Sequence, residues 1–437
     1  MKKYLVGFLV CLFLLLGGCS LKTYDQLYCL PGRSAAYRNL QETVSWAMDT
    51  MSYCAPLTGE NQQAVQSADL DGDGEEEYLV FARSVTDRPL QILIFHRDGE
   101  DFSLSGRIEG SGTAFDRVEY AQIDGVPGME LIVGRQVSDQ VLRNLSVYSF
   151  AGGSTTSLLS ASYREFVTVD LTDSGANELL LLGRSEEELT SGAAFLYGCE
   201  DEGMTFMGSV GLSGGVEDVR RVIPGKLEGG KPAVYVASAA GEDAVVTDVL
   251  AVVGQRFTNV SASAESGTSV RTLRNRFVYA TDIDEDGVLE LPSLIPMEPL
   301  QNVEKWDRQL ILWYSLREDG SACEKMYTYY NDQDGWYLCL DPLWAKRLTV
   351  IREASSYRFF IWDERYNSAE MVFSVEAFSG SDREESALSQ NRFPLYRGDT
   401  VTYAASLGVA SVQYGITQET LIGSFHLIRQ DWMTGEI

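Results

Sequence analysis

The chain has 437 residues but only two histidines, His96 and His426. A Ser-His-Asp triad or a histidine zinc site needs a histidine beside defined partners, and no such partners are evident near either one. The sequence also lacks a Walker-type phosphate loop and a dinucleotide-binding fingerprint. We therefore expect both histidines to be packed or surface residues, and we do not expect an enzyme.

Positive charge is also scarce, with 35 lysines and arginines against 63 aspartates and glutamates, a net charge of −28. Such a surface repels the phosphate backbone of nucleic acids, so a nucleic-acid partner is not expected. The same charge keeps a protein soluble and attracts cations. Hydrophobic residues make up 45% of the chain, which is enough to build a folded core.

The chain has one long apolar run, Tyr4–Leu16, which follows Lys2 and Lys3. A transmembrane helix needs about 20 apolar residues, so this run is too short to be a permanent anchor. A basic start, a short apolar segment and small residues after it are typical of a secretory signal. The sequence predicts a signal peptide at residues 1–18 and no later membrane span.

The four residues Leu16-Gly17-Gly18-Cys19 resemble the lipobox of bacterial lipoproteins. Gly17 is a less usual residue at its position. The resemblance implies cleavage before Cys19, a diacylglyceryl group on its thiol, and anchoring to the outer face of a membrane, with residues 19–33 as a lipidated tether. Acyl chains hold a protein by burying methylenes, each contributing about 0.8 kcal/mol. The alternative is a plain secretion signal.

Seven cysteines are present, of which Cys11 lies in the signal and Cys19 is the predicted lipid site. An odd number remains, so they cannot all pair. Two bridges are possible in an oxidising compartment, Cys29–Cys54 and Cys323–Cys339, although sequence spacing alone proves neither. The fifth, Cys199, is expected to be a buried apolar side chain.

An internal repeat dominates the rest of the sequence. Four segments share a glutamate eight residues after their first position, followed at once by an apolar run; they are residues 69–77, 122–130, 170–178 and 282–290. The last gap is about twice the others, so a degenerate copy is expected inside it. Arg221–Ala237 fits that place, with a glycine-rich turn that has lost its acidic residues.

Short strand-like runs with Gly and Asp turns fill the repeat region and predict a mainly β fold. A period near 50 residues, with about four strands in each unit, is typical of propeller blades. We expect a β-propeller-like domain over residues 61–340 with about five recognisable blade units. An array of β-sandwiches is the alternative.

The regions on either side of the repeats differ from it. Residues 34–60 contain a helical pattern, with Ser34 as N-cap and apolar residues spaced along one face at Tyr37, Leu40, Val44, Ala47 and Met51. Residues 341–437 mix strand-like and helical segments and predict a small α+β domain with its own core. Five of the seven tryptophans lie within residues 306–362 and are interpreted as core or domain interface rather than a sugar or peptide groove.

The first repeat offers a chelating pattern, because Asp69, Asp71 and Asp73 alternate with Gly72 and Gly74. Alternating carboxylates followed by a glutamate provide the hard oxygen ligands that Ca²⁺ prefers, and glycine allows a tight loop. The loop is not an EF-hand, because that motif requires helical flanks and a glutamate at its twelfth position.

This pattern resembles the FG-GAP/VCBS-type repeat of integrin-like β-propellers. The resemblance implies a loop that joins two strands of a blade and binds structural Ca²⁺. It is good at residues 69–77 and 282–290, weaker at 170–178 and poor at 122–130. The predicted ligands are Asp69, Asp71, Asp73, Glu77, Asp282, Asp284, Asp286 and Glu290, with Asp170 and Glu178 in the weaker loop. The glutamates rank below the aspartates because they could instead orient the strand, and every loop could be an acidic turn without metal.

Three functions are consistent with these features. The first is a membrane-anchored binding or scaffold module whose calcium-stabilised blades dock a protein or a cell-envelope glycan. The second is an envelope polysaccharide-active enzyme, because propellers also host enzymes. The third is an accessory subunit of a membrane complex. The repeats favour the first, and the sequence leaves the partner and the oligomeric state open.

Overall fold

The computed structural model describes residues 35–137, 143–150, 154–184, 192–200, 203–297, 309–363, 368–429 and 432. The predicted signal, Cys19 and its tether, Cys29, Ser34 and Trp306 lie outside these residues. In the part of the chain that is described, no helix is long and apolar enough to cross a membrane.

Six antiparallel sheets follow one another along the chain. The first sheet contains β1 (Ser52–Tyr53), β2 (Val65–Ala68), β3 (Glu77–Arg83), β4 (Leu90–Asp98) and β5 (Asp101–Gly110). The second contains β6 (Ala114–Ala121), β7 (Glu130–Gln136), β8 (Arg143–Ser149) and β9 (Thr156–Tyr163). The third contains β10 (Glu165–Val169), β11 (Glu178–Arg184), β12 (Gly192–Glu200) and β13 (Gly203–Gly211).

The fourth sheet is the degenerate copy, with β14 (Val219–Lys226), β15 (Pro232–Ala239), β16 (Val245–Val253) and β17 (Arg256–Asn259). The fifth contains β18 (Leu291–Pro296), β19 (Gln309–Leu316), β20 (Ala322–Asn331), β21 (Trp336–Leu340) and the late strand β27 (Phe425–Leu427). The sixth contains β22 (Leu348–Glu353), β23 (Ser356–Asp363), β24 (Ser368–Ser379), β25 (Phe393–Arg397) and β26 (Val401–Leu407).

The helices are short and lie mainly at the two ends of the chain. They are α3 (Ala35–Ala47), α4 (Pro342–Ala345), α5 (Arg383–Leu388) and α6 (Gln418–Ser424), with single 3₁₀ turns at Val216–Asp218, Val270–Thr272 and Val409–Tyr414. The helix expected within residues 34–60 is therefore present as α3. Its apolar face, formed by Leu40, Val44 and Met48, covers the outer side of the first sheet.

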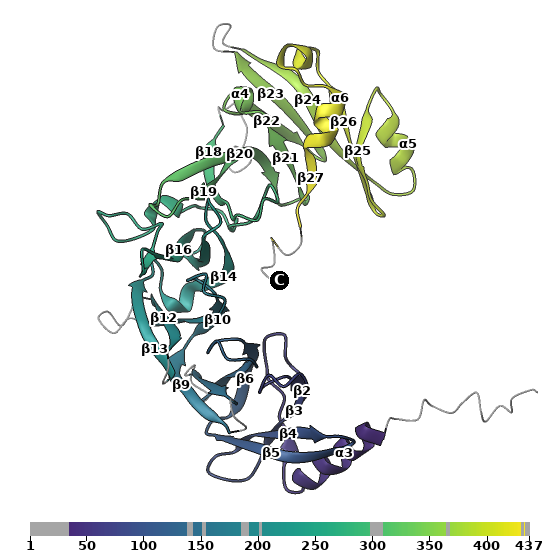
Figure 1. The fold of residues 1–437 in the computed structure, drawn as a ribbon. Coiled ribbons are helices and arrows are strands. Elements are labelled where there is room, and N and C mark those ends of the chain that lie inside the picture. Colours follow the sequence, from purple (N-terminus) through teal and green to yellow (C-terminus); the bar gives the residue numbers. More distant parts are fainter. Residues whose placement is uncertain are drawn as a thin grey trace, which may run out of the picture.

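The sheets form a curved arc, with α3 and the first sheet at one end and the sixth sheet at the other (Figure 1). Three of the six are four-stranded meanders in chain order, and the first and fifth are such meanders with one added strand. This confirms the prediction of a mainly β fold with repeated units. Among the described residues, no strand of the first sheet pairs with a strand of the sixth.

The apolar run after the first three repeat glutamates becomes the second strand of its meander and is buried on both faces, whereas the run after Glu290 becomes β18, the first strand of the fifth sheet. In β3, Leu79 and Phe81 face the second sheet, whereas Val80 and Ala82 face α3. Because both faces are covered, the strand is a continuous apolar run rather than an alternating one. Each fully buried Leu, Val or Phe contributes about 1.5–3 kcal/mol relative to an exposed one.

Backbone hydrogen bonds join the turns of neighbouring sheets. In each case the residue before the repeat glutamate donates its N–H to the carbonyl of the first residue of another turn. The bonds run from Met129 to Asp69 (3.0 Å), from Asn177 to Gln122 (2.8 Å) and from Leu289 to Lys226 (3.2 Å). The third bond shows that the degenerate turn keeps this structural role without its acidic residues.

The C-terminal region shares a core with the fifth sheet. Leu310, Tyr327 and Trp336 of the fifth sheet pack in one apolar cluster with Phe359 and Phe373 of the sixth. The strand β27 then returns to pair with β21. The strands and helices expected after residue 341 are present, but their apolar residues do not form a core separate from the fifth sheet.

The possible Cys323–Cys339 disulfide is not formed, because both residues are free thiols. In the register of β20 with β21, Cys339 faces Thr328, and Cys323 instead pairs across with Ser315 of β19. Cys54 is also a free thiol, while its proposed partner Cys29 lies outside the described residues. Cys199 is half-buried, and burial raises the pKa of its thiol.

The contact between the first two turns can be tested at two glycines that both have positive φ, Gly72 (+75°) and Gly74 (+89°). A Cβ at Gly72 would lie 2.4 Å from the carbonyl of Pro127, whereas a Cβ at Gly74 would meet nothing within 4 Å. Both Ala variants carry a backbone cost of about 1–2 kcal/mol. We expect Gly72→Ala to lose about 1–3 kcal/mol more, because of overpacking.

The measurement is urea unfolding of the mature chain in EDTA, with Gly74→Ala as the matched control. Equal losses in the two variants would contradict a stabilising contact between the first and second turns.

Candidate metal-binding loops

Each acidic loop lies in the same place in its sheet. Residues 69–77 connect β2 to β3, residues 122–130 connect β6 to β7, and residues 170–178 connect β10 to β11. Residues 282–290 lead into β18, and the bridge between Thr281 and Glu290 closes that loop. Three loops thus join the first two strands of their meanders, and the fourth joins an isolated bridge to the first strand of the fifth sheet.

The repeat glutamates are buried, and each one stabilises its loop through a hydrogen bond made from the last position of the turn. One carboxylate oxygen accepts the backbone N–H of the second loop residue. These bonds are Glu77 to Leu70 (2.9 Å), Glu130 to Ile123 (2.7 Å), Glu178 to Leu171 (2.7 Å) and Glu290 to Ile283 (3.1 Å). A hydrogen bond to a charged group contributes about 1.5–3 kcal/mol. The glutamates therefore orient the start of the strand, one of the two roles expected for them.

Three loops begin with an aspartate, and this residue stabilises the other end of its loop. Its carboxylate accepts backbone N–H groups from residues three to five positions further on. The donors are Gly72 and Gly74 for Asp69, Ser174 and Gly175 for Asp170, and Asp286 and Gly287 for Asp282. These bonds draw the loop into a ring, so that the carboxylates between them converge.

In the first loop, Asp69, Asp71 and Asp73 converge, with one oxygen of each within 4.8 Å of the others. Three carboxylates so close together repel one another unless a cation lies between them. Oxygen ligands at this spacing suit Ca²⁺, which takes six to eight oxygens including waters. The residues of the first loop therefore fit the predicted ion.

In the fourth loop the converging groups are Asp282, Asp284 and Glu290. Glu290 is fully buried, and its Oε1 has no hydrogen-bond partner among the described residues. Burial raises the pKa of Glu290 to about 8. An unpartnered buried carboxylate oxygen is costly unless a cation or proton compensates it, so this loop also fits a bound Ca²⁺.

Asp286 does not join that group. Its carboxylate pairs with Nζ of Lys325 on β20 at 2.8 Å, and Lys325 also pairs with Glu228 of the degenerate turn at 3.0 Å. The hydrogen bond from Lys325 lowers the pKa of Asp286. The lysine lies 39 residues beyond Asp286, and the loop pattern gives no indication of this contact.

The second and third loops are closed by hydrogen bonds. In the third, Thr172 donates to the remaining oxygen of Glu178 at 2.5 Å. In the second, Ser149 donates to Asp124 at 3.0 Å. Neither loop contributes to a converging group of three metal ligands within the described residues, so Asp170 and Glu178 are not brought together as a chelating set.

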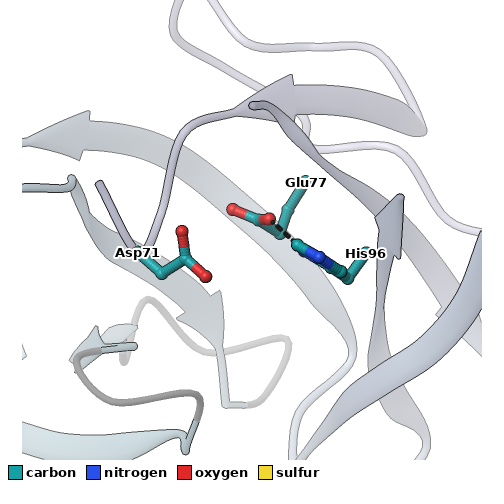
Figure 2. Close-up of side chains that lie close together, drawn as sticks. All are labelled: Asp71, Glu77 and His96. Atoms are coloured by element: carbon teal, nitrogen blue, oxygen red, sulfur yellow. Dashed lines mark hydrogen bonds and ion pairs between the residues drawn. The ribbon is translucent and has the colours of Figure 1, made fainter. Parts of the chain in front are cut away.

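Reasoning from sequence missed the partner of His96. The imidazole Nδ1 lies 2.9 Å from Oε1 of Glu77, and the carboxylate of Asp71 faces the same pair (Figure 2). The hydrogen bond with Glu77 raises the pKa of His96. The two residues are 19 positions apart and meet because β3 and β4 are adjacent. The other histidine, His426, is an exposed residue stacked on Tyr337.

A repeated aromatic residue was also missed. The residue after each repeat glutamate pairs across the sheet with Phe95, Tyr148, Tyr197 or Tyr314. These aromatics stand 18 to 24 residues after the glutamate in the sequence, and this recurrence could have revealed the hairpin register.

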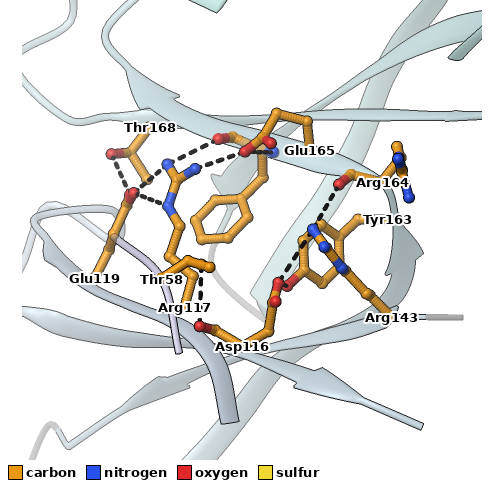
Figure 3. Close-up of polar contacts among 10 residues, drawn as sticks. Thr58, Asp116, Arg117, Glu119, Arg143, Tyr163, Arg164, Glu165 and Thr168 are labelled. Atoms are coloured by element: carbon orange, nitrogen blue, oxygen red, sulfur yellow. Dashed lines mark hydrogen bonds and ion pairs between the residues drawn. The ribbon is translucent and has the colours of Figure 1, made fainter. Parts of the chain in front are cut away.

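A second polar group joins the second and third sheets around Arg117 on β6. The guanidinium donates to Glu119 at 2.7 Å and to Glu165 of β10 at 2.6 Å, and it lies over the ring of Phe166 (Figure 3). The arginine links two sheets and its charge is balanced by the two glutamates. This arrangement is typical of a structural contact.

Asp116, beside Arg117, is buried in the same junction. It accepts a hydrogen bond from Tyr163 at 2.5 Å, lies 3.4 Å from Arg143, and its backbone carbonyl accepts from Thr58 at 3.1 Å (Figure 3). Burial, together with the bond to Asp116, raises the pKa of Tyr163. This part of the junction connects three segments that lie far apart in the sequence.

Three tryptophans of the C-terminal half are core residues, although Trp344 also lines a small cavity beside α6. Trp313 and Trp336 are fully buried, and Trp344 is also buried. Trp336 packs against Tyr357 and Phe425 in the shared core. Their interpretation as core residues is confirmed for the buried three.

No protein-family model matches the chain, and no curated protein matches it. Among solved structures, the exotype rhamnogalacturonan lyase YesX is similar over 74% of this chain and 65% of its own, with 11% identity and a TM-score of 0.30. A protein from Lactobacillus plantarum is similar over 72% of this chain and 85% of its own, with 9% identity and a TM-score of 0.27. The rhamnogalacturonan lyase YesW is similar over 73% and 67%, with 11% identity and a TM-score of 0.28.

This chain therefore spans about two thirds of the length of YesX. The TM-scores are too low to establish a shared fold, and the identities establish no shared activity.

The fourth loop can be tested with Glu290→Gln. The amide keeps an oxygen for Ile283 and removes the carboxylate charge, so in EDTA we expect stability equal to or above that of the wild type. With Ca²⁺ at 100 times its dissociation constant, the wild type should gain about 2.7 kcal/mol for each site, and the variant should lack one such increment.

Melting temperatures in EDTA and in Ca²⁺ measure this difference. Glu130→Gln is the control, because it makes the same change in a loop without converging carboxylates. If Glu290→Gln keeps the full calcium increment, the fourth loop does not bind the ion.

Proposed function

We propose that the mature protein is a lipid-anchored, extracytoplasmic binding or scaffold module built from FG-GAP/VCBS-type propeller repeats. In this proposal Ca²⁺ stabilises the first and fourth loops, and the arc of sheets docks a protein or a cell-envelope glycan. The observation that carries the proposal is the recurrence of the loops, each of which leads into a buried strand at the start of its sheet. Three of them also donate a backbone hydrogen bond to a neighbouring turn.

Calcium has a specific mechanical role in this proposal. The first loop contacts the second through Met129 and Asp69, so an ion held by Asp71 and Asp73 would stiffen a junction between sheets as well as one turn. In the fourth loop an ion would compensate the unpartnered oxygen of Glu290. A surface whose sheets are held at fixed angles loses less conformational entropy when it binds a partner than a flexible surface does.

The proposed binding surface requires no deep pocket. One cavity, beside Asp71 and Glu77, measures about 280 Å³, just below the range of ordinary ligand pockets, roughly 300–1,000 Å³. The carboxyl groups of Glu130 and Glu290 have raised pKa values because they are buried, and both fasten loops. A binding surface spread over several sheets is consistent with this arrangement.

The anchor would lie at the end of the arc that begins with α3. The predicted tether of residues 19–33 joins the lipid to this helix, and an extended chain spans at most about 3.3–3.6 Å for each residue. The first sheet would therefore stay close to the membrane, and the sixth sheet would point away from it.

The lipid is tested with Cys19→Ser. We expect the wild type to sediment with membranes and to partition into detergent, and the variant to appear in the soluble fraction, because it lacks the thiol that carries the acyl chains. Cys54→Ser is the control for loss of a cysteine as such. A Cys19→Ser protein that still sediments with membranes would contradict lipid anchoring.

Partner binding is tested by affinity capture from the envelope fraction of the source cells and on immobilised cell-wall polysaccharides. We expect one specific partner to be retained in Ca²⁺ and reduced at least tenfold in EDTA or with the double variant Asp71→Asn, Asp284→Asn. The double variant Asp243→Asn, Asp319→Asn, at two exposed turns outside the acidic loops, is the charge-matched control.

Two results would overturn the proposal. One is the absence of a retained protein or glycan. The other is turnover of a polysaccharide by the purified protein, which would establish the enzymatic alternative.

A further inference from the structure

His96 is an exception within the repeat. In each hairpin the residue after the repeat glutamate pairs with an aromatic residue, and continuing that register by one step places one residue opposite the glutamate. That residue is Ser149 in the second sheet, Gly198 in the third and Ser315 in the fifth, all small. In the first sheet it is His96, so only this copy places an imidazole beside the repeat glutamate.

The imidazole converges with two carboxylates. One possible ligand atom from each of Asp71, Glu77 and His96 lies within 4.8 Å of the others (Figure 2). The side chain of Glu77 is 6% exposed and that of His96 is 36% exposed, so the group has a buried floor and an open side. Glu77 is fixed by its bond to Leu70, which holds one ligand in place before any ion binds.

A cavity of about 280 Å³ opens on this group. Small residues of β5 form its wall, namely Ser103, Ser105 and Gly106, and Phe150 and Thr155 close it from the second sheet. A Cβ on Gly106 would lie 3.3 Å from Ile94 and 3.5 Å from Thr155, so a larger residue there would narrow the cavity. The space is sufficient for water or a small ligand beside the three side chains.

We propose that Asp71, Glu77 and His96 form an open binding site for a divalent metal ion of the zinc class. Imidazole nitrogen is a ligand that Zn²⁺ and related transition metals accept readily, whereas Ca²⁺ takes oxygen. Zinc sites with three protein ligands keep a fourth position for water or a bound molecule. The cavity provides the room for that fourth ligand.

The geometry suits such an ion. Two ligands held at about 2.0–2.2 Å from one tetrahedral zinc ion lie roughly 3.3–3.6 Å apart. The Nδ1 of His96 and the Oε1 of Glu77 stand 2.9 Å apart, so the ion can replace the shared proton once the two atoms separate by about half an ångström.

This site is distinct from the calcium loop that it adjoins, and the proposal does not rest on the proposed function. Asp69 and Asp73 belong to the loop group without contributing to the histidine group, and Asp71 belongs to both. The two ions therefore require different sets of residues that share Asp71, and variants of the unshared residues can separate the two sites.

The experiment is Zn²⁺ binding to the metal-free mature protein by titration calorimetry, together with NMR of the imidazole signals. The chain has two histidines, so each signal can be assigned by its variant. We expect one Zn²⁺ per chain and a shift of the His96 signals alone. His96→Gln should weaken binding at least tenfold, and His426→Gln should leave it unchanged.

Further variants keep the two metal proposals separate. Asp73→Asn should weaken Ca²⁺ binding and leave Zn²⁺ binding intact, whereas His96→Gln should do the reverse. The retained calcium response also shows that the His96→Gln protein is folded. Zinc that binds equally well to His96→Gln, or that leaves the His96 signals unmoved, would overturn the site.

Discussion

The fold depends on one buried contact that recurs in four sheets, the carboxylate of the repeat glutamate against the N–H of the second loop residue. This hydrogen bond fixes the turn that precedes a buried strand. The geometry of the turn then sets the register of the strand, and the register decides which side chains face each core. Without it, a buried N–H and a buried carboxylate would both lose their partners, at a cost of about 1–3 kcal/mol for each group. The degenerate copy does without the glutamate by using a shorter glycine turn and the hydroxyl of Tyr235, which bonds the carbonyls of Lys226 and Leu289.

The four copies use the second oxygen of this glutamate differently. It meets His96 in the first sheet and Thr172 in the third, and in the fourth loop it has no partner among the described residues. The backbone structure of the loop is therefore the same in these copies, while the group that contacts the second carboxylate oxygen differs. This separation explains why one repeat can supply a simple turn at one place and a candidate metal site at another.

The sequence predicted the loops well because their signal is local. The spacing from Asp69 to Glu77 and the apolar run after it are sufficient to place a turn before a buried strand. Contacts between distant segments were not predictable in this way. The meeting of His96 with Glu77 depends on the length of the β3–β4 hairpin, and that of Lys325 with Asp286 depends on how β20 crosses the fourth loop. The separation of Cys323 from Cys339 likewise depends on the register of β20 with β21, which places Thr328 opposite Cys339.

The return of β27 to the fifth sheet has a consequence for the order of folding. The edge of β21 is covered only when residues 425–427 have been made, although β21 itself ends at residue 340. The first four sheets contain all their own strands and can be completed one after another as the chain emerges. The fifth and sixth sheets must instead wait for the end of the chain and close together. A chain truncated near its C-terminus would thus still form its first four sheets. It would leave β21 with an unpaired edge, a feature that quality-control proteases and chaperones recognise.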